Sequence, residues 1–218
     1  MEMKTCGDQL ILSGPVAGNE YWYVARILSQ TPAIRVAVLR NSSGGHADTG
    51  FAVGELFREK GIATYLSGYC QSSCSRLFLG GKERFFTSDY PPGRTHVDFH
   101  SNYGNDGRML PGAPGRLRHF IMKYSDGKAD EQLVDRWVNL QNLRGFAYFF
   151  HPRTLKRRDG VSIFLCQGGE PPNDRWPYCE KIVGHDALSM GIVTSLELKR
   201  SCDADNLLID RESKTGGS

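Results

Sequence analysis

The sequence lacks any apolar stretch that approaches the roughly 20 residues needed to cross a bilayer. Its formal net charge is only +3, and no basic stripe alternates with aromatic residues, so nothing in the charge pattern indicates a nucleic-acid partner. There is no internal repeat, and residues 1–4 lead into a strand-like segment without a signal-peptide pattern. We therefore expect neither a membrane span nor a nucleic-acid complex.

The composition is that of a globular protein with a real core. Hydrophobic residues make up 39% of the 218 residues and charged residues 23%. A chain of this length most simply forms one large domain, which we place at residues 1–200. Residues 201–218 are polar, and we expect this tail to be poorly ordered.

Six cysteines are many for a cytosolic protein of this size, and an even number favours disulfides. Cys166 and Cys179 flank a turn-rich segment, and Cys6 and Cys202 lie near the two ends of the chain. Cys70 and Cys74 could be half of a metal site or could include a thiol nucleophile, but no second Cys/His pair matches them. We predict disulfides, no metal and no cofactor, in a periplasmic or otherwise extracytoplasmic location, with the cytoplasm as the alternative.

The first part of the chain alternates between strand and helix patterns. Short apolar runs bounded by turn residues predict strands, and amphipathic runs predict helices. This order predicts an α/β fold with a largely parallel sheet. The expected strands are 8–14, 34–40 and 63–68, and the expected helices are 20–30, 48–61 and 73–80.

The second part is less regular. After a strand over 96–100, residues 101–115 form a glycine-rich loop that is long for a compact domain and is therefore functional or mobile. A helical pattern over 116–143 is interrupted near residues 125–127. The aromatic segment 146–150 is interpreted as a surface that needs a cover. Beyond it we expect a strand over 161–166 and a strand, short helix and strand over 180–195.

Two of the strand-to-helix turns carry reactive or ligand-binding residue types. Residues 41–45 read NSSGG, and residues 70–74 read CQSSC just before the apolar run 77–79. The carboxyl ends of parallel strands are where α/β proteins bind ligands. Adjacent glycines expose backbone N–H groups, and a serine at the start of a helix lies in a field that favours negative charge. Such donors around a nucleophilic oxygen suit acyl transfer, with His100 as a base.

These stretches resemble the ClpP/crotonase superfamily, most closely the ClpP-like proteins predicted to be periplasmic in bacteria. The loop 41–45 is similar to the family's N-S-P-G-G loop, with Ser43 in place of proline, and residues 72–74 are similar to the S-A-C of the periplasmic branch. Residues 99–100 and 187–193 resemble the histidine strand and the closing helix-turn. The resemblance spans about residues 8–100 and 180–195 and implies a ClpP/crotonase-like spiral fold of strand–helix repeats.

The resemblance also implies roles for individual residues. Ser72 would be the nucleophile of a serine peptidase and His100 its base, while the oxyanion would be held by Gly44, Gly45 and Ser73. Outside the resemblance, Ser72 could simply cap the helix that follows, and His100 could be a structural strand residue. The other five histidines are assigned to the surface or to structure, although His46 is near enough to the glycine loop to touch substrate.

The acidic residue that should orient His100, as the third member of a Ser–His–acid triad, is the least defined of the predicted catalytic residues. The family's aspartate falls at Cys179 or Glu180, of which Glu180 is the better carboxylate, with Asp174 and Asp186 as alternatives.

The resulting prediction is a homo-oligomeric serine peptidase that acts on a peptide or protein substrate. Two alternatives on the same fold are an inactive oligomeric binding or scaffold protein and a crotonase-type acyl-CoA enzyme.

Overall fold

The structure is a computed structural model that describes residues 1–91, 93–153, 155, 159–171, 175–205 and 207. Asp174 and most of the expected polar tail lie outside these residues. Within the described part, no helix is long and apolar enough to cross a membrane.

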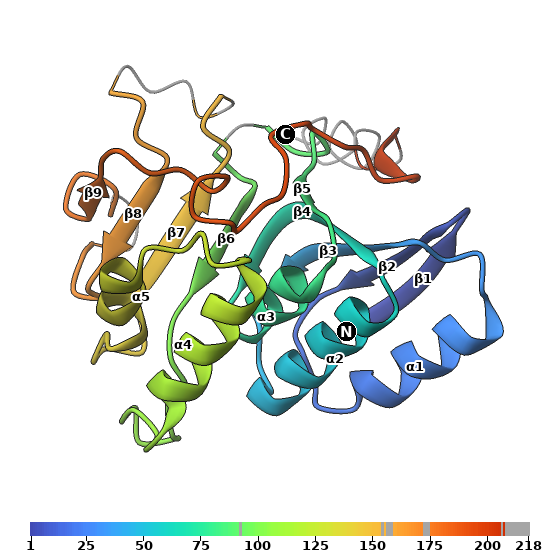
Figure 1. Ribbon diagram of the computed structural model, residues 1–218, viewed down its shortest axis with the longest axis horizontal. Coiled ribbons are helices and arrows are strands. Elements are labelled where there is room, and N and C mark those ends of the chain that lie inside the picture. The colour runs from blue at the N-terminus through green and yellow to red at the C-terminus, as the bar shows by residue number, and fades with distance from the viewer. Residues whose placement is uncertain (92, 154, 156–158, 172–174, 206, 208–218) are drawn as a thin grey trace, which may run out of the picture.

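A single nine-stranded sheet forms the centre of the molecule (Figure 1). Its main path has the order β1-β2-β3-β4-β6-β7-β8-β9, and β5 pairs with β4 beside that path. The pairings from β2 to β6 are parallel, whereas β1, β7, β8 and β9 pair in antiparallel fashion. The strands are β1 (Glu2–Cys6), β2 (Gln9–Ser13), β3 (Val36–Ser42), β4 (Ala63–Gln71), β5 (Arg84–Phe86), β6 (His96–Phe99), β7 (Phe146–Phe150), β8 (Ile163–Cys166) and β9 (Glu180–Ile182).

The described residues also form five helices, of which α1, α2 and α4 lie in front of the strands in Figure 1. They are α1 (Glu20–Gln30), α2 (Ala47–Glu59), α3 (Ser73–Gly80), α4 (Ala113–Tyr124) and α5 (Glu131–Val138). Helix α2 packs closely on α3: a Cβ added at Gly54 would lie 2.4 Å from the carbonyl oxygen of Arg76. The side chains of α3 are buried along its whole length, which explains the apolar run that follows CQSSC.

The predicted α/β class is confirmed, and the interruption of the helical pattern near residue 125 separates α4 from α5. The sheet is mixed, with parallel pairing from β2 to β6 and antiparallel pairing toward both edges. Two expectations need correction. Residues 146–150 form a largely buried strand, β7, and not an exposed aromatic surface, because its side chains pack alternately into two hydrophobic clusters of the same chain. After β9, residues 183–195 form turns, without the expected short helix and second strand.

All six cysteines are paired in disulfides. Two pairs, Cys166–Cys179 and Cys6–Cys202, join the positions that the sequence singled out. The third pair, Cys70–Cys74, excludes both a metal half-site and a free thiol nucleophile at the CQSSC turn, because neither sulfur is free.

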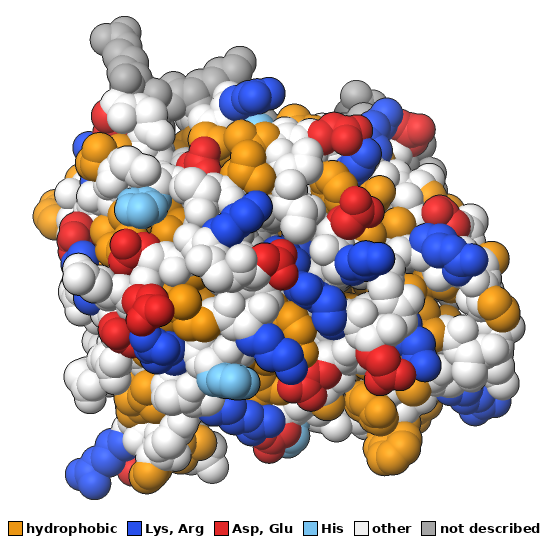
Figure 2. Space-filling view, viewed as in Figure 1, with side chains coloured by type: hydrophobic (Ala, Val, Ile, Leu, Met, Phe, Trp, Pro, Cys, Tyr) orange, Lys and Arg blue, Asp and Glu red, His pale blue; other side chains and the backbone are white. Residues whose placement is uncertain are grey.

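The surface carries mixed charge. On the face seen in Figure 2, the Lys and Arg side chains are interspersed with Asp and Glu, and no side chains of one sign gather into a continuous patch. This face therefore gives no support to a nucleic-acid interface.

Candidate active site

The site lies at the carboxyl edge of the parallel strands. β3 runs into the glycine loop, β4 ends directly at Ser72, and β6 ends directly before His100. Because β3, β4 and β6 are parallel neighbours, their carboxyl ends meet at one edge of the sheet. The topology thus brings together segments that are about 30 residues apart from one another in the chain.

Ser72 occupies the N-cap position of α3, but its side chain does not cap the helix. Its Oγ lies 2.7 Å from Nε2 of His100 instead. The backbone at Ser72 has φ 53° and ψ −120°, a conformation that glycine favours. Residues held in such regions cost on the order of 1–3 kcal/mol and cluster at active sites. The simple capping interpretation of Ser72 is therefore excluded by the geometry.

The glycine loop packs directly against this serine. Gly44 has φ +80°, and a Cβ on it would lie 2.5 Å from the carbonyl oxygen of Gln71 and 2.7 Å from Cβ of Ser72. The Gly44 N–H donates to Oγ of Ser42, at 3.3 Å. Gly45 has φ +141°, and Ser73 is the first residue of α3, where backbone N–H groups have no partner within the helix. The loop and the helix start therefore meet beside the serine hydroxyl.

His100 is held neutral by its surroundings. Burial, and then the nearby positive charge of Arg76, lower its pKa from 6.5 to about 3, while the backbone carbonyl of Leu143 acts in the opposite direction. The ring stacks on Phe146, with centroids 4.1 Å apart. Its second nitrogen, Nδ1, is buried and makes no hydrogen bond of normal geometry with any described residue. A neutral imidazole facing a serine hydroxyl can accept its proton.

Arg76 lies one helical turn beyond Ser72 and is fully buried. Its Nη2 donates to the carbonyl oxygen of His100 and to Oδ1 of Asn102, at 3.2 and 2.6 Å. Burial, reinforced by the charge of Arg116, lowers the pKa of Arg76 to about 9. These contacts tie the start of the loop after β6 to α3 and fix the backbone of His100.

Asp98 is a buried carboxyl group in β6, two residues before His100. It accepts a hydrogen bond from Nε2 of Gln71 at 3.0 Å and lies 3.4 Å from Nε2 of His96. Burial raises its pKa, while His96, Gln71 and the backbone of Ser72 act in the opposite direction. Asp98 thus supports the backbone of the nucleophile turn, and none of its hydrogen bonds goes to His100.

The structure does not bring Glu180 to His100. Along the register Phe99–Ala147–Leu165–Glu180, three strand spacings of about 4.8 Å each separate the two ends, roughly 14 Å in all. Glu180 is instead hydrogen-bonded to Arg136 at the surface. Of the alternatives, Cys179 is in a disulfide, Asp186 accepts N–H groups of its own turn, and Asp174 lies outside the described residues.

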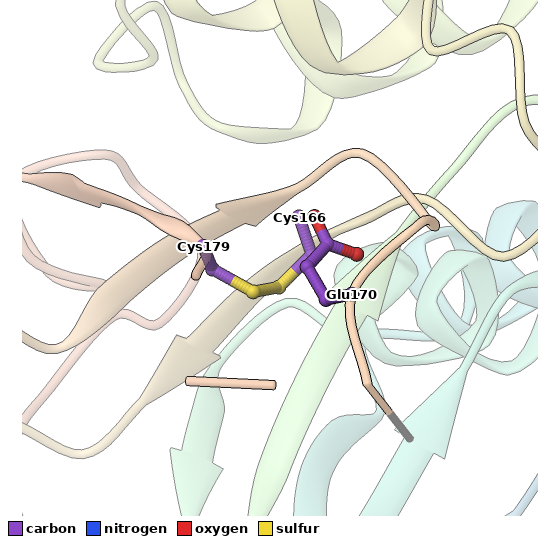
Figure 3. Close-up of side chains that lie close together, drawn as sticks. All are labelled: Cys166, Glu170 and Cys179. Atoms are coloured by element: carbon purple, nitrogen blue, oxygen red, sulfur yellow. A yellow bond between two sulfur atoms is a disulfide. The ribbon is translucent and has the colours of Figure 1, made fainter. Parts of the chain in front are cut away.

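One other group resembles a metal site. Cys166, Glu170 and Cys179 lie close together, but Figure 3 shows the two sulfurs bonded to each other. The carboxylate of Glu170 accepts the backbone N–H groups of Gln167 and Gly168. These contacts account for all three side chains without a metal.

Of the other candidates, His46 is the N-cap of α2 and accepts the N–H of Thr49 at Nδ1. Sequence reasoning missed Arg76 and Asp98, because a single Arg within an apolar helix and a single Asp within a strand have no signal of their own. It also missed the approach of Leu143 to His100, which only the folded chain creates.

The fold and the Ser72–His100 pair together define an α/β protein with a serine–histidine pair at the carboxyl edge of its parallel strands. Among solved structures, the chain is similar to a peptidase from Plasmodium falciparum, at 11% identity over 89% of this chain and 96% of that one, with a TM-score of 0.53. It is also similar to a mutant of ClpP1 from Listeria monocytogenes, at 13% identity over 91% and 94% of the two chains, with a TM-score of 0.52.

A protein described as an enoyl-CoA hydratase of Streptomyces avermitilis gives 15% identity over 98% of this chain and 72% of that one, with a TM-score of 0.46. No protein-family model matches the sequence, and no curated protein is similar to it. At these identities the similarity to the Plasmodium peptidase and to the ClpP1 mutant shows the fold alone, and the activity has to be argued from the site.

Proposed function

We propose that the protein is a ClpP-like serine peptidase that cleaves peptide bonds through an acyl-enzyme. The observation that carries this proposal is the 2.7 Å contact between Oγ of Ser72 and Nε2 of His100, made by a serine that occupies a cap position without capping. A serine hydroxyl needs an adjacent base to become a nucleophile near neutral pH, and a neutral His100 is such a base.

In the proposed reaction, Ser72 Oγ attacks the scissile carbonyl carbon and its proton passes to Nε2 of His100. The backbone N–H groups of Gly45 and Ser73 hold the negative oxygen, and Gly44 brings the loop into contact with the serine. His100 then gives the proton to the leaving amine. Water, deprotonated by His100, releases the acyl group and restores Ser72.

Glu180 has no part in this mechanism, because it pairs with Arg136 three strands from His100. The Leu143 carbonyl, which raises the pKa of His100, is the group that we assign to stabilise the protonated ring. A Ser–His pair of this kind acts without a carboxylate partner.

One observation favours a second candidate, an inactive binding protein on the same fold. Nδ1 of His100 is buried and makes no hydrogen bond of normal geometry with any described residue, so the ring lacks the carboxylate contact of a complete triad.

A fluorophosphonate probe separates the two candidates, because it reacts with an activated serine and not with a passive one. The folded wild type should be labelled, and Ser72→Ala should not be. A wild-type protein that stays unlabelled in every assembly state would favour the binding protein.

The remaining proposals concern location and assembly. Three disulfides suit an oxidising compartment, and we assign the protein to the periplasm or another extracytoplasmic space. The assembly proposal, a homo-oligomer, now rests on the family resemblance alone, since residues 146–150 are buried within the chain. Light scattering at micromolar concentration checks it, and a monomer would contradict it.

A further inference from the structure

The Cys70–Cys74 disulfide encloses the proposed nucleophile. Cys70 is the penultimate residue of β4 and Cys74 the second residue of α3, so the bond closes a short ring over residues 70–74 with Ser72 at its centre. Both cysteines are fully buried. Of the other two disulfides, Cys166–Cys179 packs beside Phe146, which stacks on His100, and Cys6–Cys202 lies at the start of β2, away from the site.

The backbone inside this ring has an unfavourable conformation. Ser72 has φ 53° and ψ −120°, which a residue with a Cβ adopts only when its surroundings impose it. The Ser72 carbonyl accepts bonds from the N–H and Oγ of Ser75, and Gly44 packs on the other side. These contacts fix the carbonyl side of the residue. The disulfide restrains the two chain segments that enter and leave it.

We propose that the Cys70–Cys74 disulfide is a positioning element that holds Ser72 in this conformation, so that the site is competent only in the oxidised protein. The hydroxyl must stay within hydrogen-bond distance of His100 for proton transfer, and a misplacement of about 1 Å can cost on the order of 100-fold in rate. The effect of the disulfide on the reaction rate rests on the proposed peptidase function. Its effect on the backbone conformation of Ser72 does not depend on that function.

The kinetic test compares two disulfide-free variants. Cys70→Ala/Cys74→Ala removes the bond around Ser72. Cys6→Ala/Cys202→Ala is the control, since Cys6 pairs with Gln9 at the start of β2, at the edge of the sheet opposite the site. With both variants shown to be folded by circular dichroism, fluorophosphonate labelling of the first should slow by about 100-fold. The control should keep the wild-type rate. A folded Cys70→Ala/Cys74→Ala protein that reacts at the wild-type rate would overturn the proposal.

A second measurement keeps the inference testable if the first variant does not fold. Tris(2-carboxyethyl)phosphine reduces a disulfide to two thiols by two electrons and is itself oxidised to the phosphine oxide, whose oxygen comes from water. Graded reduction of the wild type, with alkylation mapping of each cysteine, should show labelling lost in step with Cys70 and Cys74. Labelling that persists after these two cysteines are fully alkylated would contradict the proposal.

The conformational test needs no activity. Glycine tolerates the φ and ψ of residue 72, so Ser72→Gly should raise the urea midpoint of the disulfide-intact protein. Without the disulfide, Ser72 is free to relax, and the same substitution should raise the midpoint by much less. Equal gains in both backgrounds would show that the disulfide does not hold the conformation. If the wild type is never labelled but the gains differ, the peptidase proposal fails and the positioning role stands.

Discussion

Burial and the charge of Arg76 oppose the protonation of His100, and the Leu143 carbonyl offsets them only in part. The histidine ring is buried, Arg76 places a positive charge nearby, and Phe146 stacks on one face. A buried imidazole without an anionic neighbour keeps its neutral form far below the usual pKa of 6.5. The same surroundings keep the proton-accepting neutral form populated from neutral pH down to about pH 3.

The first prediction follows from this pKa of about 3. The rate of fluorophosphonate labelling should stay nearly constant between pH 8 and pH 5, because His100 remains neutral throughout the range. A stopped-time labelling series over these pH values, with protein integrity checked at each point, measures it. A rate that falls with a midpoint near 6.5 would show that His100 titrates like an exposed histidine.

The same shift gives a second prediction, on stability. In the unfolded chain His100 takes up a proton near pH 6.5, whereas the folded protein takes it up only near pH 3. The unfolded state therefore binds more protons between these values, and the free energy of unfolding falls as the pH drops from about 6.5 toward 3. Urea titrations at several pH values should show less of this loss in His100→Gln, which cannot titrate. An equal loss in both proteins would contradict the assignment.

A third prediction concerns Ser73, whose side chain, unlike that of Ser72, should not be needed for the reaction. Its Oγ is buried and has no hydrogen-bond partner among the described residues, and its proposed role belongs to its backbone N–H. A buried polar group without a partner costs about 1–3 kcal/mol. Ser73→Ala should therefore keep the labelling rate and raise the melting temperature. Calorimetry and labelling of the same sample test both points, and a strong loss of labelling with an intact fold would give Ser73 a chemical role.

At the scale of elements, the site depends on how closely the loop after β3 approaches the β4–α3 turn. Gly44→Ala would place Cβ 2.5 Å from the Gln71 carbonyl oxygen at φ +80°. We expect a loss of more than about 3 kcal/mol in the free energy of unfolding, together with loss of labelling.

The control is Gly7→Ala, at φ +58° with no atom within 4 Å of the added Cβ. It carries only the conformational cost of about 1–2 kcal/mol. Chemical denaturation of both variants gives the comparison. Equal losses would mean that the contact between the glycine loop and Ser72 is not tight.

The order of elements from β2 to β6, apart from the three-residue strand β5, could be predicted from the sequence, because each apolar run and each turn residue there acts locally. The antiparallel second half could not, since β7, β8 and β9 depend on long-range pairing. The aromatic strand β7 illustrates this difficulty. A short apolar run has the same sequence pattern whether it is buried inside its own chain or at an interface with another chain. Likewise, Ser72 and His100 were predicted from ordered motifs, whereas Arg76 and Asp98 come near the site only through folding.

At the scale of the whole molecule, a disulfide cross-links the two ends of the described chain. Cys6–Cys202 links β1 to the last described turns across 196 positions of sequence. A bond that closes so long a loop stabilises a protein by about 5 kcal/mol in the chain-entropy account. This disulfide therefore links the first strand of the sheet to the last described turns of the chain. The candidate site lies at the carboxyl edge of the parallel strands.

The mass of the non-reduced protein tests this covalent framework. We expect a mass lower by six hydrogens than that of the reduced chain, and peptide mapping should give Cys6–Cys202, Cys70–Cys74 and Cys166–Cys179. The extracytoplasmic assignment depends on the same result. Six thiols open to alkylation in the native protein would contradict both the framework and the assignment.

The most direct test of the central claim is to locate the fluorophosphonate adduct by peptide mass spectrometry. The account predicts one adduct per chain, on Ser72, which disappears in Ser72→Ala and is strongly reduced in His100→Ala, because the hydroxyl then has no base within reach. An adduct on Ser73, or a labelled Ser72→Ala protein, would contradict the assignment of the nucleophile. A wild type that acquires no adduct would contradict the claim that this site performs acyl transfer.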